Sequence, residues 1–339
     1  MRPLVSLAVI GSALDTALDL TVVGGYTNLG YRLRRPWWDD RELNSMRGRN
    51  VLVTGATSGL GLAAAEGFAA LGADVWLLAR DPERGEAARA SVATRAEGTV
   101  RLEICDLAEL ASVRAFADRF TARVPRLDVL VNNAGVMTAR RELSADGIEL
   151  TFAVNVVAGF LLTERLLGAL RAARPGPGRV INVSSGGMYA QRLRAGDLQS
   201  AHGDFDGTAV YARSKRAEVV LTELWAQRLS AGDVTVHAMH PGWADTPGVK
   251  SSLPRFYRIT KPLLRSPAQG ADTIVWLGSA DRAAESSGGF WHDRRRRPVH
   301  LLPGTTETAA DRERLWAECE RLAGRSASTA DADPPAPPS

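Results

Sequence analysis

The sequence predicts an α/β fold of Rossmann type, a doubly wound parallel sheet in a single domain with an N-terminal helical extension. Short apolar runs alternate with segments of helical periodicity, which is the order of βαβ crossovers. A glycine-rich turn at residues 54–61 joins the first apolar run to the first helical segment. The chain has 339 residues with 45% apolar composition, which is enough to bury one core of this kind.

Each predicted strand is a short run of β-branched and aliphatic residues, and the predicted helices lie between or after these runs. Strands are expected at 51–54, 75–79, 100–104, 129–131, 180–183 and 234–238. Helices are expected at 60–71, 82–96, 108–123, 147–172, 210–230, 267–279 and 309–323. Residues 48–323 therefore form the predicted main domain. Residues 324–339, rich in Ser, Ala, Asp and Pro, are expected to be disordered.

The charge balance argues against a nucleic-acid partner, since 42 Lys and Arg face 38 Asp and Glu. The basic run 294–297 is interpreted as a solvated turn before Pro298, with contact to phosphate or acidic lipid as the alternative. Cys105 and Cys319 form neither a metal spacing nor a disulfide framework, and the histidines show no ligand spacing. We therefore expect no metal and a reducing, cytoplasmic location.

Residues 1–47 are predicted to be a helical extension that begins with an amphipathic helix. Asp15 and Asp19 lie on its polar side. The apolar run before Asp15 is shorter than the ~20 residues that span a bilayer. Docking on the protein itself, a homo-oligomer contact and a peripheral membrane contact are the alternatives, and the two aspartates favour protein over anionic lipid. We expect removal of residues 1–40 to leave the cofactor site intact. The apolar side consists of Leu4, Leu7, Gly11, Leu14 and Leu18.

The glycine-rich turn predicts a dinucleotide site, because missing side chains let the backbone approach a pyrophosphate at a helix N-terminus. Arg80 ends the second predicted strand, where such sites often carry an acid for the ribose 2′-hydroxyl. A guanidinium favours a 2′-phosphate, so NADP(H) is favoured over NAD(H). Asp81, followed by Pro82, is interpreted as a helix N-cap. The predicted contacts in the turn are Gly55, Thr57, Ser58, Gly59, Leu60 and Gly61.

Tyr211 and Lys215 are four residues apart on a predicted helix and therefore share one face. An ammonium group beside a tyrosine favours the phenolate, whose ordinary pKa is about 10, and brings it toward a range useful for acid/base chemistry. Tyr211 is therefore the predicted proton donor or acceptor of a carbonyl/alcohol reaction.

Two further motifs lie between the glycine-rich turn and Tyr211: Asn-Asn-Ala-Gly at 132–135, and the serine pair Ser184 and Ser185. In this order, the motifs resemble the short-chain dehydrogenase/reductase family over roughly residues 47–291. The stretches that begin at Ser184 and His240 look like the retinol-dehydrogenase-like branch, and most like the group called dehydrogenase/reductase SDR family member twelve.

The resemblance implies roles for further residues. Ser185 would hydrogen-bond the reacting oxygen, with Ser184 as the alternative. Lys215 would also hold the nicotinamide ribose. Asn155 would position a water in a proton relay, or would instead satisfy a neighbouring carbonyl. The implied cofactor contacts outside the turn are Asp106, Leu107, Asn132, Ala134, Gly135, Tyr211, Lys215, Pro241, Gly242, Ala244 and Thr246.

Together these features predict an NADP(H)-dependent oxidoreductase that interconverts a carbonyl and an alcohol on a small-molecule substrate. Met137, Met188 and Trp243 lie near the expected pocket and favour a lipophilic substrate. The alternative is a catalytically idle NADP(H)-binding scaffold that reports redox state through partner contacts. Loss of Tyr211 or Lys215 would favour the scaffold, and both residues are present.

Overall fold

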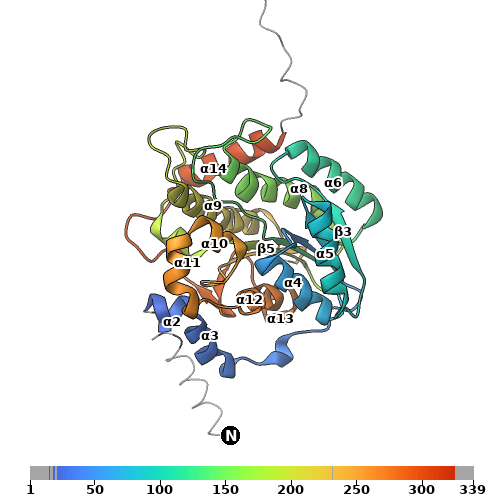
Figure 1. The fold of residues 1–339 in the computed structure, drawn as a ribbon. Helices are drawn as coiled ribbons and strands as arrows, with labels where there is room; N and C mark the ends of the chain where they lie inside the picture. Colours follow the sequence, from blue (N-terminus) through green and yellow to red (C-terminus); the bar gives the residue numbers. More distant parts are fainter. Residues whose placement is uncertain (1–14, 16–17, 20, 231, 325–339) are drawn as a thin grey trace, which may run out of the picture.

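One sheet forms the centre of the protein in the computed structural model, which describes residues 15, 18–19, 21–230 and 232–324 (Figure 1). Its eight strands follow the order β3-β2-β1-β4-β5-β6-β7-β8. Neighbouring strands are parallel except β7 and β8. The order from β3 to β6 is that of doubly wound dinucleotide-binding sheets, so the predicted fold class is confirmed. The strands are β1 Asn50–Thr54, β2 Asp74–Ala79, β3 Val100–Ile104, β4 Val129–Asn132, β5 Gly178–Val183, β6 Val234–Met239, β7 Phe290–His292 and β8 Arg295–Arg297.

The last two strands are not among the predicted elements, and the solvated turn predicted at 294–297 is wrong for Arg294, which is buried, while Arg296 is exposed. Arg295–Arg297 form β8, which is antiparallel to β7. Arg294 is only 3% exposed, and its Nε lies 2.7 Å from Oδ1 of Asp272. A run of arginines lacks the apolar alternation that predicts a strand. Its burial could not be predicted either, because the acids that neutralise it come from distant parts of the chain.

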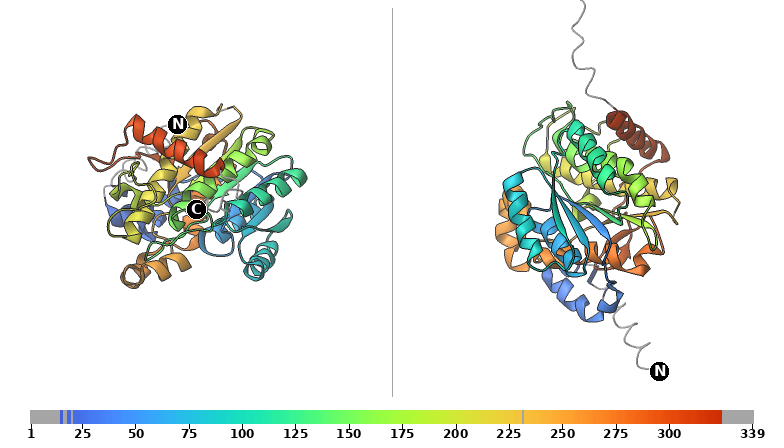
Figure 2. Two further views of the ribbon diagram at one scale, coloured as in Figure 1. Left: turned by 90° about the horizontal axis from the view of Figure 1, so that it is seen from above. Right: turned by 90° about the vertical axis from the view of Figure 1, so that its right-hand side faces the viewer.

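Two layers of helices cover the two faces of the sheet (Figure 2). Val51 and Val53 pack with the first layer, and Leu52 between them packs with the second, as alternation along a strand requires. The first layer contains α4 Gly59–Ala70, α5 Pro82–Ala93 and α12 Pro267–Ser279. The second contains α6 Leu110–Arg123, α8 Ala158–Arg171, α9 Gly207–Arg228 and α14 Ala309–Gly324. The shorter elements after β5 are η4 Gly186–Ala190, α10 Pro247–Ser252, α11 Pro254–Thr260, η5 Lys261–Leu263 and α13 Asp281–Ala284.

The helix predicted at 147–172 begins three residues later and contains an irregular turn. It runs as α7 Leu150–Phe152, the π-helical turn η3 Ala153–Val157, and α8. This stretch is the one described helix long and apolar enough to cross a bilayer, but most of it is buried inside the protein. Its apolar composition is therefore explained by packing in the core.

The N-terminal segment folds as several short helices that lie beside α11 and α12 (Figure 1). Tyr31 bonds to Asp272 of α12, and Trp276 of α12 donates to Glu42 at 2.6 Å. The predicted apolar residues Leu4, Leu7, Gly11 and Leu14 lie outside the described residues. At the other end, Gly324 was placed in the predicted tail but is the last residue of α14, and the rest of that tail is not described. The N-terminal elements are α2 Val22–Tyr26, α3 Asn28–Arg34, η1 Arg35–Trp37 and η2 Asp40–Glu42.

Candidate active site

The glycine-rich turn lies between the end of β1 and the N-terminus of α4, and neighbouring backbone closes tightly around it. Gly55 has a φ of +64°, and a Cβ there would lie 2.9 Å from Cα of Ala134. A Cβ on Gly61 would lie 2.4 Å from the carbonyl oxygen of Gly55. Only glycine fits these two positions. The turn leads directly into the 12-residue helix α4, whose first N–H groups are free to bind an anion. The other predicted contacts of the turn, Thr57, Ser58, Gly59 and Leu60, are half-buried around it.

Thr54 and Asn133 clamp this turn to the end of β4, and neither was among the predicted site residues. The hydroxyl of Thr54 accepts hydrogen bonds from the backbone N–H groups of Asn133 and Ala134, both at 2.9 Å. The side chain of Asn133 donates to the carbonyl of Thr54 at 2.9 Å. Both residues stand in the quoted motifs, but the sequence does not reveal that they bond to each other.

The predicted cofactor contacts Arg80 and Asp106 follow β2 and β3. Arg80 is exposed directly after β2, and Asp81 caps α5 by accepting from Glu83 N at 2.9 Å and Arg84 N at 3.1 Å. The predicted N-cap is therefore confirmed. Asp106 is half-buried after β3 and accepts from the backbone of Ala108 at 2.9 Å. This bond orders the turn that presents Asp106.

The turn after β6, which contains Pro241, Gly242 and Ala244, is held by the N-terminal segment. Trp243 N donates to the carbonyl of Tyr26 at 2.7 Å. Gly242 has a φ of +74°, and a Cβ there would lie 2.7 Å from that same carbonyl. These contacts do not fit the expectation that residues 1–40 can be removed without effect on the cofactor site. Farther along, a methyl of Thr246 lies 3.2 Å from the Cβ position of Gly59, which brings this turn to the glycine-rich turn.

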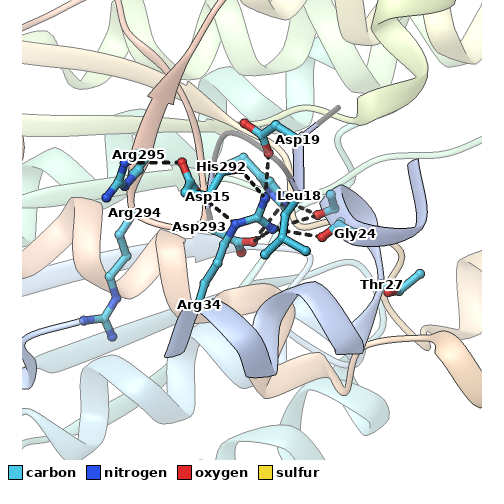
Figure 3. A network of polar contacts seen from close by, with 12 residues as sticks. Asp15, Leu18, Asp19, Gly24, Thr27, Arg34, His292, Asp293, Arg294 and Arg295 are labelled. Atoms are coloured by element: carbon cyan, nitrogen blue, oxygen red, sulfur yellow. Dashed lines mark hydrogen bonds and ion pairs between the residues drawn. The ribbon is translucent and has the colours of Figure 1, made fainter. Parts of the chain in front are cut away.

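A buried polar network fixes these contacts, and we call Asp15, Arg34, Arg265, His292 and Asp293 the anchor cluster. Figure 3 labels four of its members, Asp15, Arg34, His292 and Asp293. Asp293 receives both terminal nitrogens of Arg265, at 2.6 and 2.9 Å, and Nη1 of Arg34 at 3.0 Å. Nε of Arg34 donates to Asp15 at 2.6 Å. Burial would raise the pKa of Asp293, but His292, Arg265 and Arg34 outweigh it and hold the pKa well below its usual range.

Asp15 and Asp19, predicted to be a polar face that disfavours anionic lipid, pair with arginines of the same chain; Asp15 is buried and Asp19 is exposed. Both also bind Arg297 of β8, with Asp15 at 2.8 Å. The part of the N-terminal segment that the structure describes docks on its own domain through charge. Its predicted apolar side lies outside the described residues except for Leu18.

Tyr211 and Lys215 share one face of α9, and Ser185 at the end of β5 meets them. Ser185 is half-buried and hydrogen-bonds the Tyr211 hydroxyl. Ser184 is buried instead, and its hydroxyl donates to the carbonyl of Lys215 at 2.8 Å. Burial raises the pKa of Tyr211, while Lys215 and the bond with Ser185 act to lower it and Glu218 raises it further. Of the two serines, Ser185 is the one whose hydroxyl faces the tyrosine.

Lys215 forms a buried ion pair with Glu218, a residue absent from the predicted site. Its Nζ lies 2.6 Å from Oε1 of Glu218 and 3.0 Å from the carbonyl of Val183. Burial alone would lower the pKa of Lys215, yet Glu218 and Tyr211 outweigh burial and raise it. For Glu218, burial raises the pKa to about 7 against the opposing effect of Lys215. The spacing of three residues on one helix was the available sequence signal.

Asn155 and Gly135 complete the inner side of this site. Asn155 lies in η3, accepts from Val136 N at 2.8 Å, and donates to Val136 O and to Ser214 at 3.1 and 2.9 Å. Its side chain therefore satisfies the backbone after β4, which is the alternative role predicted for it, hydrogen bonding to a neighbouring carbonyl. A Cβ on Gly135 would lie 3.3 Å from Nζ of Lys215 and 3.4 Å from Oδ1 of Asn155.

A small cavity of about 20 Å³ lies beside α9, lined by apolar and polar side chains. Oε2 of Glu218 and Oδ1 of Asn132 are buried and have no hydrogen-bond partner among the described residues. The amide nitrogen of Asn132 donates to Asn182 at 2.9 Å. Leu107 also reaches this cavity, which places it near β4 and β5. The polar side chains around the cavity are Thr54, Asn132, Asn155, Thr163, Asn182 and Glu218.

Aromatic rings line the outer side of the site. The ring of Tyr26 occupies the space beside Gly186, where a Cβ would lie 2.0 Å from Cε1 of Tyr26. Trp243 is half-buried and lies 6.1 Å from Tyr26 and 5.0 Å from Phe256 between ring centroids. The prediction that Met188 lies near the pocket is wrong, because this side chain is fully buried in an apolar cluster.

The fold and this site define the class of protein: a Rossmann-type sheet with a dinucleotide cradle and an adjacent serine, tyrosine and lysine. The family model of the short chain dehydrogenases matches residues 49–255. The chain belongs to the short-chain dehydrogenase/reductase family, and it is an NAD(P)-dependent oxidoreductase.

The relatives place the chain within the predicted branch. It is 44% identical to dehydrogenase/reductase SDR family member 12 of Bos taurus, over 88% of this chain and 94% of that protein. It is 36% identical to retinol dehydrogenase 12 of Bos taurus, over 81% of this chain and 86% of that protein. The predicted resemblance is confirmed.

Solved structures with the same fold include complexes with NADP. A protein from Mycobacterium paratuberculosis matches with a TM-score of 0.64 and 30% identity over 84% of this chain and 97% of that one. The Pseudomonas aeruginosa RhlG/NADP complex matches with a TM-score of 0.60 and 26% identity over 73% of this chain and 94% of that one.

Proposed function

We propose that the protein is an NADP(H)-dependent oxidoreductase that interconverts a carbonyl and an alcohol, with Tyr211 as the general acid/base. The observation that carries the proposal is the meeting of Ser185, Tyr211 and Lys215 at one end of the sheet, beside Gly135. Nζ of Lys215 lies 5.6 Å from the centre of the Tyr211 ring.

The glycine-rich turn suits a dinucleotide, because Gly55 and Gly61 let the backbone pack tightly between β1 and the N-terminus of α4, where N–H groups can bind a pyrophosphate. When bound, a nicotinamide dinucleotide supplies or takes up the hydride of the reaction. Arg80 is exposed directly after β2, at the position where NAD(H)-binding sites often carry an acid for the ribose 2′-hydroxyl. A guanidinium at this position supports NADP(H) over NAD(H). The residues proposed to hold the cofactor are Gly55, Thr57, Ser58, Gly59, Leu60, Gly61, Arg80, Asp106, Leu107, Asn132, Ala134, Gly135, Tyr211, Lys215, Pro241, Gly242, Ala244 and Thr246.

In the direction of reduction, the Tyr211 hydroxyl gives its proton to the substrate oxygen, and in oxidation the phenolate takes it back. Ser185 donates a hydrogen bond to the same oxygen as negative charge develops on it. Lys215 stabilises the phenolate electrostatically. Asn155 fixes the backbone after β4, so that Gly135 stays beside the ammonium group.

We propose a lipophilic substrate. Tyr26, Trp243 and Phe256 form an aromatic wall beside the loop of Ser185, and burial of a substrate's apolar surface against it would contribute roughly 25 cal/mol per Å².

A screen of aliphatic and aromatic aldehydes, ketones and alcohols, with NADPH consumption or NADP⁺ reduction followed by absorbance, tests the proposal. We expect turnover on at least one member of the panel, and we expect Tyr211→Phe to lower it by about 10²–10⁴-fold. A protein that binds NADPH but turns over no member of the panel would favour the redox-reporting scaffold. Dissociation constants tighter for NADH than for NADPH would contradict the cofactor assignment, and Arg80→Asp should weaken NADPH binding while sparing NADH.

We also propose a cytoplasmic location, with peripheral membrane contact through the N-terminal helix as the alternative. A homo-oligomer contact is the other alternative for that helix. Among the described residues, no group of three or more His, Cys, Asp and Glu side chains is arranged to hold a metal ion. Sedimentation of the full chain with and without vesicles separates the alternatives.

A further inference from the structure

Glu218 is a buried carboxyl group that the proposed reaction does not use. It is only 7% exposed, and it lies on the same helix as Tyr211 and Lys215 and lines the small cavity together with Asn155. One oxygen binds Lys215 at 2.6 Å, and the other has no hydrogen-bond partner among the described residues. A buried carboxylate is costly unless its oxygens are bonded, so a half-bonded one needs an explanation.

The surroundings of Glu218 leave Lys215 as its one charged neighbour in this part of the described chain. The side chains that share its cavity are neutral: apolar residues together with Thr54, Asn132, Asn155, Thr163 and Asn182. Lys215 has the Glu218 carboxylate and the Val183 carbonyl as its hydrogen-bond acceptors. The charge of each group therefore depends on the other.

This pairing has a consequence for Lys215 that follows from burial. An ammonium group that is 2% exposed loses its hydration, and burial of this kind favours the neutral amine. A carboxylate at 2.6 Å opposes that effect and keeps the amine protonated. Without Glu218, the cation that acts on Tyr211 would be lost at lower pH.

We propose that Glu218 is a positioning residue of the active site: it holds the Lys215 side chain at the end of β5 and keeps it charged beside Tyr211. The inference rests on the proposed function, in which the Lys215 ammonium stabilises the Tyr211 phenolate. Glu218 itself does not touch the reacting atoms.

The composition of the chain allows a direct test, because lysine occurs only at positions 215, 250 and 261. Lys250 and Lys261 are exposed and serve as internal references. NMR titration of the full chain labelled with [¹³Cε]lysine follows the three side chains separately and needs no substrate. In the unmodified protein Lys215 should lose its proton at a higher pH than the references.

In Glu218→Gln, the Lys215 midpoint should fall by at least one pH unit, a tenfold change in proton affinity, and should lie below the references. Glu218→Asp keeps the negative charge, so its midpoint should stay above that of Glu218→Gln. The matched control is Glu223→Gln on the same helix. Glu223 does not contact Lys215, and its carboxylate pairs with Arg312 at 2.6 Å. This control should leave Lys215 unchanged.

An unchanged Lys215 midpoint in Glu218→Gln would overturn the proposal. So would unfolding of both Glu218 variants, judged by circular dichroism, with Glu223→Gln folded, because Glu218 would then be a structural group. On a carbonyl substrate from the screen, Glu218→Gln should move the alkaline limb of the kcat profile to lower pH with KM little changed. If no substrate is found but the Lys215 midpoint falls, the proposed reaction fails and the role of Glu218 stands.

Discussion

Two buried sets of charges lie in this molecule, and they differ in how completely their atoms are bonded. In the anchor cluster, Asp293 receives a bidentate contact from Arg265. It also accepts a bond from Arg34, which Figure 3 shows beside it. At the active site, Glu218 and Lys215 share one short contact, and the second Glu218 oxygen is left without a partner among the described residues. The two carboxyl groups shift in opposite directions: the pKa of Asp293 lies well below its usual range, and burial raises that of Glu218 to about 7.

The difference separates a structural use of buried charge from a reactive one. A carboxylate that accepts several charged hydrogen bonds keeps its charge over the whole physiological range, and so it joins segments permanently. An underbonded pair can change its protonation near neutral pH, which is useful beside a proton donor. The following variants test this distinction.

Tyr211→Phe should give the largest effect, because it removes the hydroxyl that transfers the proton and leaves the cradle intact. Turnover should fall by about 10²–10⁴-fold, the usual contribution of a general acid or base. Stopped-flow or steady-state absorbance measures the rate, and NADPH fluorescence checks that cofactor still binds. Near-normal turnover would mean that another group is the acid.

Arg265→Met should unfold the anchor cluster, because it leaves the charge of Asp293 buried with fewer partners. Removing one member of a buried ion pair typically costs about 3–5 kcal/mol in the free energy of unfolding. Arg321→Gln, which removes an exposed pair with Glu318, should change it by less than about 1 kcal/mol. Urea unfolding measures both, and equal losses would show that the cluster has no special weight.

The pH dependence of stability should differ in sign between the two sites. A depressed folded pKa means that the contribution of Asp293 is present above an unfolded pKa of about 4 and is lost only as the pH falls through the lower folded value. The raised pKa of Glu218 means that the folded state binds a proton that the unfolded state has released. The free energy of unfolding should therefore fall as the pH rises from 4.5 to about 7.

Urea unfolding of Glu218→Gln across pH 4 to 8 checks this second sign. The variant should lose the decrease in stability that the unmodified protein shows between about 4.5 and 7. Asp293→Asn should show no difference in slope across that window. Parallel curves for Glu218→Gln and the unmodified protein would indicate that Glu218 titrates normally.

Tyr26→Leu should give the smallest effect, since it changes one part of the aromatic wall and keeps the backbone carbonyl that binds Trp243. We expect KM for bulky aromatic carbonyl substrates to rise a few-fold, with kcat and NADPH affinity nearly unchanged. Initial-rate kinetics with a bulky and a small aldehyde provide the comparison. An equal effect on both aldehydes would show that Tyr26 does not contact the substrate as part of the aromatic wall.

Some residues that complete the site carry no recognisable signal in the sequence. Arg34 and Arg265 carry no motif, and their partner Asp293 follows β7 far from Arg34 in the chain. The arginine run 294–297 was predicted to be solvated because charge without a visible partner normally faces water. Its neutralisation depends on Asp15, Asp19 and Asp272, which only folding brings near.

By itself, the sequence determined the alternating elements, the glycine-rich turn and the helical spacing of Tyr211 and Lys215. These features depend on neighbours within a few residues or on a repeat period, so they can be recognised locally. Only the tertiary structure decided that the N-terminal segment holds the turn after β6, that Ser185 rather than Ser184 faces Tyr211, and that Glu218 is half-bonded. Burial and long-range charge pairing set those outcomes, and both are properties of the packed chain.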